Sequence, residues 1–244
     1  MKTRTVNFYA KSFVLILFVV LVTSGCSKED LCIKGNGRSV FETRSLTVFY
    51  EVVNNGSFEV RILPSTQYEV IVDAESNLIE YIRTSVSGGK LYIETVGNRC
   101  INNTLTMVVT VYTPYVDGLE LNGSGFISAY DLYLDELQIR LNGSGQIIAD
   151  ADALLIKANI SGSGTIDLSG IAPTTEFTIS GSGRINAYPL TQQRCYASIS
   201  GSGNMYVKPT ELLDVLITGS GNVYYKGNPS IVQRISGSGR IIRQ

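Results

Sequence analysis

The stretch Leu141–Ile147 reads LNGSGQI, and its Gly-Ser-Gly tripeptide decides the fold of this chain. The tripeptide occurs seven times, at 123–125, 143–145, 162–164, 181–183, 201–203, 219–221 and 237–239. Gly/Ser-rich sequence usually forms linkers or turns. A near-constant period of 18 to 20 residues is instead typical of a stacked repeat architecture. The sequence therefore predicts a repeat protein.

Apolar residues alternate with polar ones on both sides of each tripeptide. Around the second unit, every second residue is apolar or glycine: Leu137, Ile139, Leu141, Gly143, Gly145, Ile147 and Ala149. Period-two alternation predicts strands with one buried face, and the phase is kept through the tripeptide. We therefore expect the tripeptide to continue the strand path, with both glycines directed at the core.

Glycine is expected at these positions because the backbone bends there, or approaches the next coil too closely for a Cβ. Glycine also permits positive φ if a corner requires it. The predicted structural glycines are Gly123, Gly125, Gly143, Gly145, Gly162, Gly164, Gly181, Gly183, Gly201, Gly203, Gly219, Gly221, Gly237 and Gly239.

A coil of 18–20 residues repeated in register predicts an all-β fold, a β-solenoid of the right-handed parallel β-helix type. About seven coils would occupy residues 119–244, each adding about 4.8 Å along the axis. Length differences are expected between the units, in segments such as Asp167–Thr175 and Tyr188–Arg194, which contain prolines. An all-β sandwich is the alternative fold, but it does not explain a constant tripeptide at a constant period.

Residues 33–118 lack the regular spacing of the Gly-Ser-Gly units. We expect them to form a less regular β-rich portion that caps or continues the solenoid. Ile33–Gly37 and Asn55–Phe58 look like degenerate units, the second with Phe58 in place of the second glycine. Asn77–Ile82 predicts a short helical turn, and Ser87–Lys90 predicts a hairpin or corner turn. Whether this portion is a separate domain stays open.

Residues 1–25 resemble a bacterial lipoprotein signal peptide. A basic start precedes the apolar run 13–22, which is too short to span a bilayer comfortably, and Thr23-Ser24-Gly25-Cys26 follows. The resemblance implies cleavage before Cys26 and acylation of Cys26, which leaves 26–32 as a tether. Thr23 stands where such signals usually carry Leu, so an ordinary signal peptide with an unmodified Cys26 is the alternative.

The tether also has two interpretations. Ser27-Lys28-Glu29-Asp30 is similar to the surface-export signal of Bacteroidetes-type lipoproteins, or it is a solvated spacer. We expect a cell-envelope protein that is lipid-anchored in the outer membrane. Its exposure at the cell surface or in the periplasm stays open.

Several segments in order resemble one known family. They are Asn54–Ile62 (NNGSFEVRI), Tyr68–Ile82 (YEVIVDAESNLIEYI), Gly89–Thr95 (GKLYIET) and the Gly-Ser-Gly series up to Gly239. Over roughly residues 33–241 the chain resembles the "putative auto-transporter adhesin, head GIN domain" family. This resemblance implies a β-helical envelope protein. The name of the family implies an adhesin-like role, and the resemblance implies no catalytic residue.

The composition excludes several kinds of chemistry. The chain has no histidine, which removes Ser-His-Asp and Cys-His arrangements and His-ligated zinc. It has no CxxC motif and no phosphate-binding loop, and no basic cluster suited to nucleic acid. We therefore expect no cofactor, no metal and no nucleic-acid partner.

Carboxylates and cysteines are the remaining candidates for chemistry. Asp131, Asp135, Glu136, Asp150, Asp152 and Asp214 are scattered between the predicted coils, and a solvated surface is favoured over a glycosidase-type pair. Cys32 and Cys100 can pair in an oxidising envelope. Cys195 has the inward parity and is expected to be a buried apolar thiol.

Stacked coils would also create two outward rows of polar residues, with about 4.8 Å between neighbouring residues of one row. One row precedes the first glycines: Asn122, Asn142, Ser161, Ser180, Ser200, Thr218 and Ser236. The other lies between the glycines: Ser124, Ser144, Ser163, Ser182, Ser202, Ser220 and Ser238. These groups either satisfy backbone groups or face water at a tight corner, or they present a flat polar surface to a polymer or protein.

The leading hypothesis is a non-catalytic, lipid-anchored envelope protein with an adhesin-like role towards a protein or glycan ligand. Its contact with the membrane would be the N-terminal lipid. One alternative is a β-helical polysaccharide lyase or glycosidase, which would show acidic and basic residues clustered on one inter-coil face. Another is an envelope scaffold or stress-response protein without an external ligand. The oligomeric state stays open.

Overall fold

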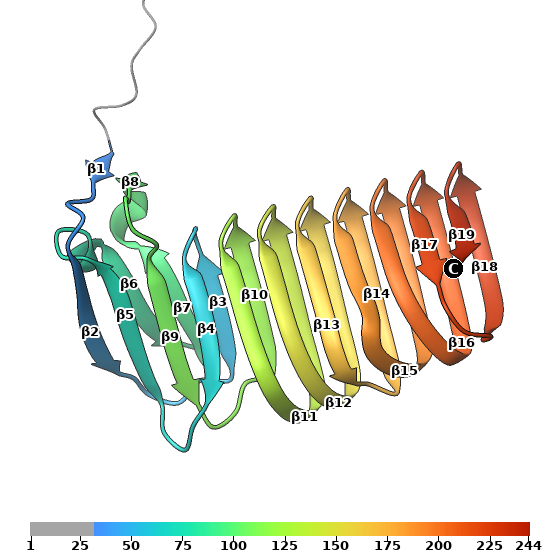
Figure 1. The fold of residues 1–244 in the computed structure, drawn as a ribbon, viewed down its shortest axis with the longest axis horizontal. Helices are drawn as coiled ribbons and strands as arrows, with labels where there is room; N and C mark the ends of the chain where they lie inside the picture. Colours follow the sequence, from blue (N-terminus) through green and yellow to red (C-terminus); the bar gives the residue numbers. More distant parts are fainter. Residues whose placement is uncertain (1–31) are drawn as a thin grey trace, which may run out of the picture. The chain divides into compact units, whose positions relative to one another are not determined.

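The structure is a computed structural model that describes residues 32–244. Residues 33–244 form one unit, a β-solenoid whose coils stack side by side (Figure 1). The predicted signal peptide, Cys26 and the tether up to residue 31 lie outside the described residues. Among residues 32–244, no helix has the length and hydrophobicity needed to cross a membrane.

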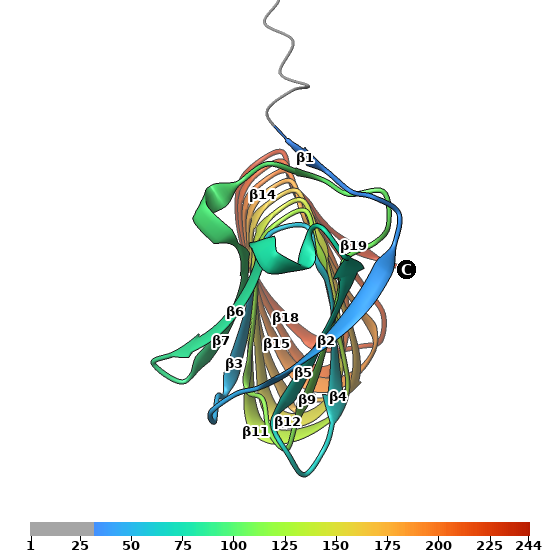
Figure 2. The same cartoon turned by 90° about the vertical axis from the view of Figure 1, so that its left-hand side faces the viewer.

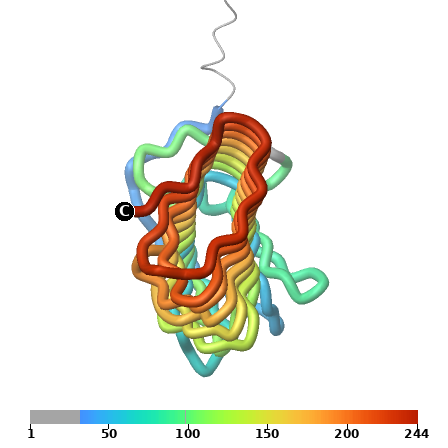
Figure 3. The backbone as a smooth tube through the Cα atoms, turned by 90° about the vertical axis from the view of Figure 1, so that its right-hand side faces the viewer, coloured from blue at the N-terminus to red at the C-terminus, as the bar shows by residue number. Residues whose placement is uncertain are grey.

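The repeat region consists of parallel strands that pair from coil to coil. The strands are β10 (Gly118–Gly123), β11 (Phe126–Gly143), β12 (Gln146–Gly162), β13 (Thr165–Ile171), β14 (Thr174–Gly181), β15 (Arg184–Gly201), β16 (Asn204–Gly219), β17 (Asn222–Tyr225), β18 (Ser230–Gly237) and β19 (Arg240–Arg243). Seen from the C-terminal end, successive coils overlie one another as an elongated ring (Figure 3). The β-solenoid prediction is therefore confirmed.

Each coil has two sides joined by a tight corner and an open bend. We call the side whose strands run into the Gly-Ser-Gly corners the lead-in face, and the side that follows the corners the lead-out face. β10, β14 and β18 belong to the lead-in face, and β13, β17 and β19 to the lead-out face. The long strands β11, β12, β15 and β16 begin on the lead-out face and end on the lead-in face.

The pairing register follows the tripeptides. Gly143 pairs with Gly123 of one neighbouring coil and with Gly162 of the other. Register shifts occur away from the corners, between Ala129 and Leu132, between Asp167 and Gly170 and between Ala187 and Arg194. The last two fall in the segments named as sites of length differences between repeats, and the first lies in the corresponding part of an earlier coil.

Stacking of like residues fills the space between the two faces. Leu141, Ile160 and Ile179 occupy one inward row, and each is at most 1% exposed. In the last coil, Ile231 and Ile235 are 40% and 41% exposed because the described residues provide no further coil to cover them. A coil therefore needs a neighbour to bury its apolar residues, as expected for a solenoid.

The corner itself differs from the expected strand path. Each strand ends at the first glycine and the next begins after the second, so the chain passes between faces across Ser-Gly. The prediction of a continuous strand is wrong here. A tight reversal of this kind keeps the same alternation of inward and outward residues as a straight strand, so the sequence pattern does not distinguish the two. The prediction that the backbone bends and approaches the next coil closely is confirmed.

The two glycines of each unit are required for different reasons. The first glycines have φ between 122° and 150°, a region that favours glycine. Their carbonyl oxygens point along the stack: that of Gly123 accepts hydrogen bonds from the N–H groups of Ser144 and Gly145, at 3.0 and 3.1 Å. A Cβ on the second glycine, Gly145, would meet the carbonyl of Gly125 and the side chain of Leu121. The second glycine therefore makes room for an aliphatic residue of the preceding coil.

The N-terminal portion contributes two further coils out of chain order. β3 (Glu51–Asn55) and β4 (Glu59–Pro64) stack on β10 and β11, and β7 (Lys90–Thr95) and β9 (Val108–Thr113) stack on β3 and β4. The corner between β3 and β4 is the degenerate unit, because the carbonyls of Gly56 and Phe58 accept the N–H groups of Gly125 and Phe126. The prediction that Phe58 replaces a second glycine is confirmed.

Antiparallel strands close this end of the solenoid (Figure 2). β2 (Ser39–Ser45) and β5 (Glu69–Glu75) extend the lead-out face, and β6 (Ile82–Ser87) extends the lead-in face. Gly88 and Gly89, both with positive φ, form the predicted hairpin turn between β6 and β7. The predicted helical turn is the 3-10 helix η2 (Ile79–Tyr81), and a second one, η3 (Val96–Asn98), lies nearby.

Two short strands complete the cap. β1 (Ile33–Lys34) pairs with β8 (Ile101–Asn102), so the prediction that Ile33–Gly37 is a degenerate corner is wrong. Cys32 and Cys100 are both disulfide-bonded. That they bond to each other stays a prediction.

A buried carboxylate organises the cap. Glu75 is fully buried and accepts hydrogen bonds from Gly37 N, Thr104 Oγ1, Thr104 N and Leu105 N, at 2.6 to 3.3 Å. The Thr104 hydroxyl, together with these backbone N–H groups, lowers the pKa of Glu75 from 4.5 to about 2, although burial acts in the opposite direction. One side chain thus joins three separate segments.

We predict that Glu75→Gln lowers the melting temperature at neutral pH. Because the folded-state pKa lies below the unfolded-state value, the carboxylate contributes stability that is fully present above pH 4.5 and is lost as pH falls towards about 2. The variant should therefore lose less stability than wild type over that range, as thermal melts across pH would show. Glu80→Gln, at an exposed position, is the control, and a Glu75→Gln variant that melts like wild type at neutral pH contradicts the assignment.

We also predict opposite outcomes for neighbouring corner substitutions. Gly143→Val combines positive φ with overlap on the Gly123 carbonyl, and should cost about 3 kcal/mol or more. Ser144→Ala changes an exposed side chain and should stay within about 0.5 kcal/mol of wild type. Urea unfolding measures both, and equal midpoints would contradict the proposed role of the corner.

Candidate binding surfaces

The edge formed by the corners presents the predicted serine row. All seven serines between the paired glycines are exposed. Within residues 32–244 their hydroxyls have no hydrogen-bond partner, and the nearby backbone groups are satisfied instead by the stacked glycine carbonyls. The hydroxyls therefore face water and are available to a ligand.

The row before the first glycines is ordered in a different way. Asn122 Nδ2 donates to Asn55 Oδ1 and Asn142 Nδ2 donates to Asn122 Oδ1, both at 2.8 Å. The parallel register places Ser161 and Ser180 next in the same row. The row is thus an amide ladder at its N-terminal end and a line of exposed hydroxyls further on.

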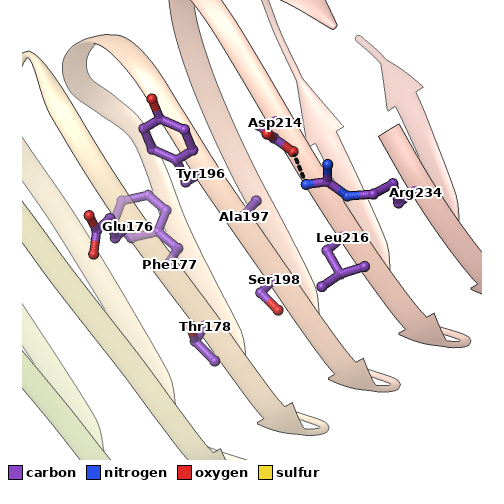
Figure 4. Close-up of a pocket in the computed structure, with 9 residues that line it drawn as sticks. All are labelled: Glu176, Phe177, Thr178, Tyr196, Ala197, Ser198, Asp214, Leu216 and Arg234. Atoms are coloured by element: carbon purple, nitrogen blue, oxygen red, sulfur yellow. Dashed lines mark hydrogen bonds and ion pairs between the residues drawn. The ribbon is translucent and has the colours of Figure 1, made fainter. Parts of the chain in front are cut away.

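The lead-in face carries a shallow groove of about 420 Å³ across β14, β15, β16 and β18 (Figure 4). Arg234 and Asp214 form a 2.7 Å ion pair in its lining. Tyr196 and Leu216, 40% and 42% exposed, supply apolar surface between polar neighbours. This combination suits a ligand with both apolar and hydrogen-bonding groups.

Charged residues also gather on the N-terminal half of the lead-in face. Glu51 pairs with Lys90 at 2.7 Å and lies 3.5 Å from Arg140, while Glu136 pairs with Lys157 at 2.9 Å. The Lys157 contact lowers the pKa of Glu136. Acidic and basic groups on one inter-coil face are the feature expected of the enzyme alternative, and here most of them neutralise each other.

One hollow beside these pairs is lined by carboxyls that are not all paired with a basic residue. Glu51, Tyr115, Asp117, Asp135 and Glu136 line about 330 Å³ of space. Burial, with the charges of Glu51 and Glu136, raises the pKa of Asp117 although a hydrogen bond with Tyr115 acts in the opposite direction. Burial and Asp117 likewise raise the pKa of Tyr115. The hollow thus holds carboxyls of unequal acidity.

The structure does not bring all of the predicted carboxylates together. Asp135 and Glu136 share the hollow, whereas Asp214 lines the groove on other coils. On the lead-out face Asp150 accepts a hydrogen bond from Ser169. Asp152 and Asp131 lie at the open bends, where Asp131 has positive φ. Among the described residues, no group of three or more Cys, Asp or Glu side chains is arranged to hold a metal ion.

Cys195 is a free and fully buried thiol. Burial raises its pKa to about 12, although Thr175 acts in the opposite direction, so the thiol stays protonated. The prediction of a buried apolar thiol is confirmed.

Sequence reasoning did not identify a row of tyrosines on the lead-out face. Tyr206 and Tyr224 pair in register, and their rings stack at 4.9 Å with an interplanar angle of 8°. Tyr188 meets Tyr206 edge-on at 5.7 Å. Aligning the repeats on their second glycines would have predicted the stacked pair, because both tyrosines follow that glycine by three residues.

Comparisons with known proteins agree with this geometry. The solenoid resembles a crystallised "putative adhesin" from Bacteroides fragilis (TM-score 0.81, 22% identity, 87% of this chain and 100% of that one). It also resembles a "putative adhesin" (0.72, 22%, 87% and 99%) and a "putative lipid binding protein" (0.71, 25%, 87% and 99%), both from Parabacteroides distasonis. The search of curated proteins gave no match.

The sequence itself supplies the family assignment. Residues 48–229 match the family described as "Putative auto-transporter adhesin, head GIN domain". This range includes the out-of-order N-terminal coils and six of the seven tripeptides. The chain therefore belongs to the head GIN domain family.

Proposed function

We propose that this chain is a non-catalytic binding protein of the bacterial cell envelope, held to the outer membrane by lipid on Cys26 and adhesin-like in its role. The observation that carries the proposal is the exposed, ordered outer surface: free serine hydroxyls along the corner edge and a mixed apolar and polar groove. A packed solenoid leaves its outer rows free to vary, because the inward rows maintain the fold.

The comparisons support the adhesin-like part of this proposal. The family description and the names of two similar structures refer to adhesins. The predicted lipobox at Thr23–Cys26 supplies the anchor in this proposal. The residues after it would serve as a tether to the solenoid.

A second candidate function rests on the hollow around Asp117. The pKa of Asp117 is raised and that of its neighbour Glu136 is lowered. Two carboxyls of unequal acidity are the arrangement used for general acid and base chemistry on polysaccharides. In this candidate, Asp117 would donate a proton to the leaving oxygen, and Asp135 or Glu136 would take a proton from the water that attacks the anomeric carbon.

We predict that the groove contributes to ligand binding. Tyr196→Ser combined with Leu216→Ser should weaken binding of the purified protein to its hits on a glycan and protein array, because both residues supply exposed apolar surface. Tyr133→Ser combined with Leu154→Ser, at positions 73% and 64% exposed outside the groove, is the matched control. Absence of any hit, and of binding to whole cells, would overturn the proposed function.

For the anchor, the replacement Cys26→Ser tests the lipid directly. It should move the protein from the membrane fraction to the soluble fraction. Protease treatment of intact cells then reports which side of the outer membrane the solenoid occupies.

For the second candidate we predict the following pH behaviour. The raised pKa keeps Asp117 protonated to higher pH than an ordinary aspartate, so turnover of uronic or neutral polysaccharides should fall as pH rises through that pKa. Asp117→Asn should abolish turnover, while Asp152→Asn at an exposed bend should not. Wild-type protein without turnover on these substrates excludes the enzyme and leaves the binding function.

A further inference from the structure

The lead-out face has a concentrated positive charge at its C-terminal end. The segments 184–188, 204–208, 222–226 and 240–244 lie on four neighbouring coils. They contain five basic residues and no Asp or Glu. We define the basic tyrosine patch as the outward basic and tyrosine residues of these segments, namely Arg184, Lys208, Lys226, Arg240, Tyr188, Tyr206 and Tyr224.

The cations of this patch are not neutralised by the protein. Within residues 32–244 there are seven ion pairs, and none of them includes a basic residue of the patch. On the lead-in face of the same coils, by contrast, Arg234 is paired with Asp214. The positive charge is therefore available to an external anion.

The stacking register spaces these cations along the solenoid axis. The N–H of Lys226 donates to the carbonyl of Val207, which sets Lys226 beside Lys208 on the next coil. Arg184 and Arg240 stand in one register row, separated by two asparagines. Three coil steps span about 14 Å at the usual strand spacing. The patch therefore suits an extended polymer with repeated negative charges rather than a single small anion.

The tyrosines restrict the chemistry of the ligand. The facing sides of Tyr206 and Tyr224 are occupied by their mutual stacking, and the ammonium of Lys226 lies 4.3 Å from the ring centroid of Tyr188. Single-stranded nucleic acid needs free aromatic faces on which bases stack. Within the described residues the hydroxyls of Tyr206 and Tyr224 have no partner, so each offers a hydrogen bond to the ligand.

The geometry points to an acidic polysaccharide, with uronate or sulfate groups, lying along the basic tyrosine patch. Its anionic groups would contact the lysine and arginine side chains, and its hydroxyls would bond to the tyrosine hydroxyls. This inference deepens the proposed binding function and rests on it. The patch lies at the end of the solenoid opposite the cap (Figure 1), so it uses a surface separate from the N-terminal hollow.

The test measures binding of the full-length protein to polygalacturonate, heparin and uncharged dextran. Wild type should bind the two polyanions, with an affinity that falls as salt is added, and should not bind dextran. Lys208→Gln combined with Lys226→Gln should weaken polyanion binding about tenfold through the loss of two exposed charges. Arg38→Gln, an exposed and unpaired arginine at the cap, is the control and should bind like wild type.

The tyrosine contribution is tested separately. Tyr206→Phe combined with Tyr224→Phe keeps both rings and removes both hydroxyls, so it should weaken binding without altering the thermal melt. Melting curves of all variants confirm that the solenoid is intact.

Several outcomes would overturn the inference. These are equal binding to dextran, no effect of the lysine variant, or a preference for single-stranded DNA or anionic vesicles over both glycans. Array hits that survive the lysine variant would leave the proposed binding function standing while removing the acidic polysaccharide. If wild type gives no array hit and binds no whole cells, both the proposed binding function and the inferred acidic polysaccharide are overturned.

Discussion

The carbonyl oxygen of each first corner glycine determines the rest of this structure. It points along the stack and accepts N–H groups of the next corner, which requires a backbone conformation that other residues rarely adopt. The second glycine then leaves space for the aliphatic residue two positions before the preceding corner, such as Leu141 beneath Gly164. Register and core packing are therefore set by one local motif, repeated with every coil.

A register fixed at the corners has consequences for the outer surface. Each outward position aligns with the same position on the neighbouring coils, so a row acquires its chemistry from one residue per coil. The asparagine ladder, the serine edge and the tyrosine stack are three results of the same stacking. Changing an outward residue alters the surface without disturbing the inward rows.

The repeat half was predictable from the sequence, and the N-terminal half only in part. Strand parity around the tripeptides identified the coils, but the same parity describes a straight strand and a tight corner. Cap strands β5 and β6 intervene between the coil β3–β4 and the coil β7–β9, so chain order does not give spatial order. The role of Glu75 depends on segments that meet only in the fold, and no local pattern marks it. The tyrosine stack was predictable in principle, since the repeats align.

Charge is distributed differently on the two faces, and folding alone does not explain the difference. On the lead-in face acidic and basic groups face each other, as Glu136 and Lys157 do. On the C-terminal lead-out face Lys226 stands beside Lys208, and Arg184 and Lys226 lie over tyrosine rings rather than carboxylates. Like charges on adjacent strands are unfavourable. An arrangement that works against the fold and leaves its charge towards solvent is better explained by a binding partner than by stability.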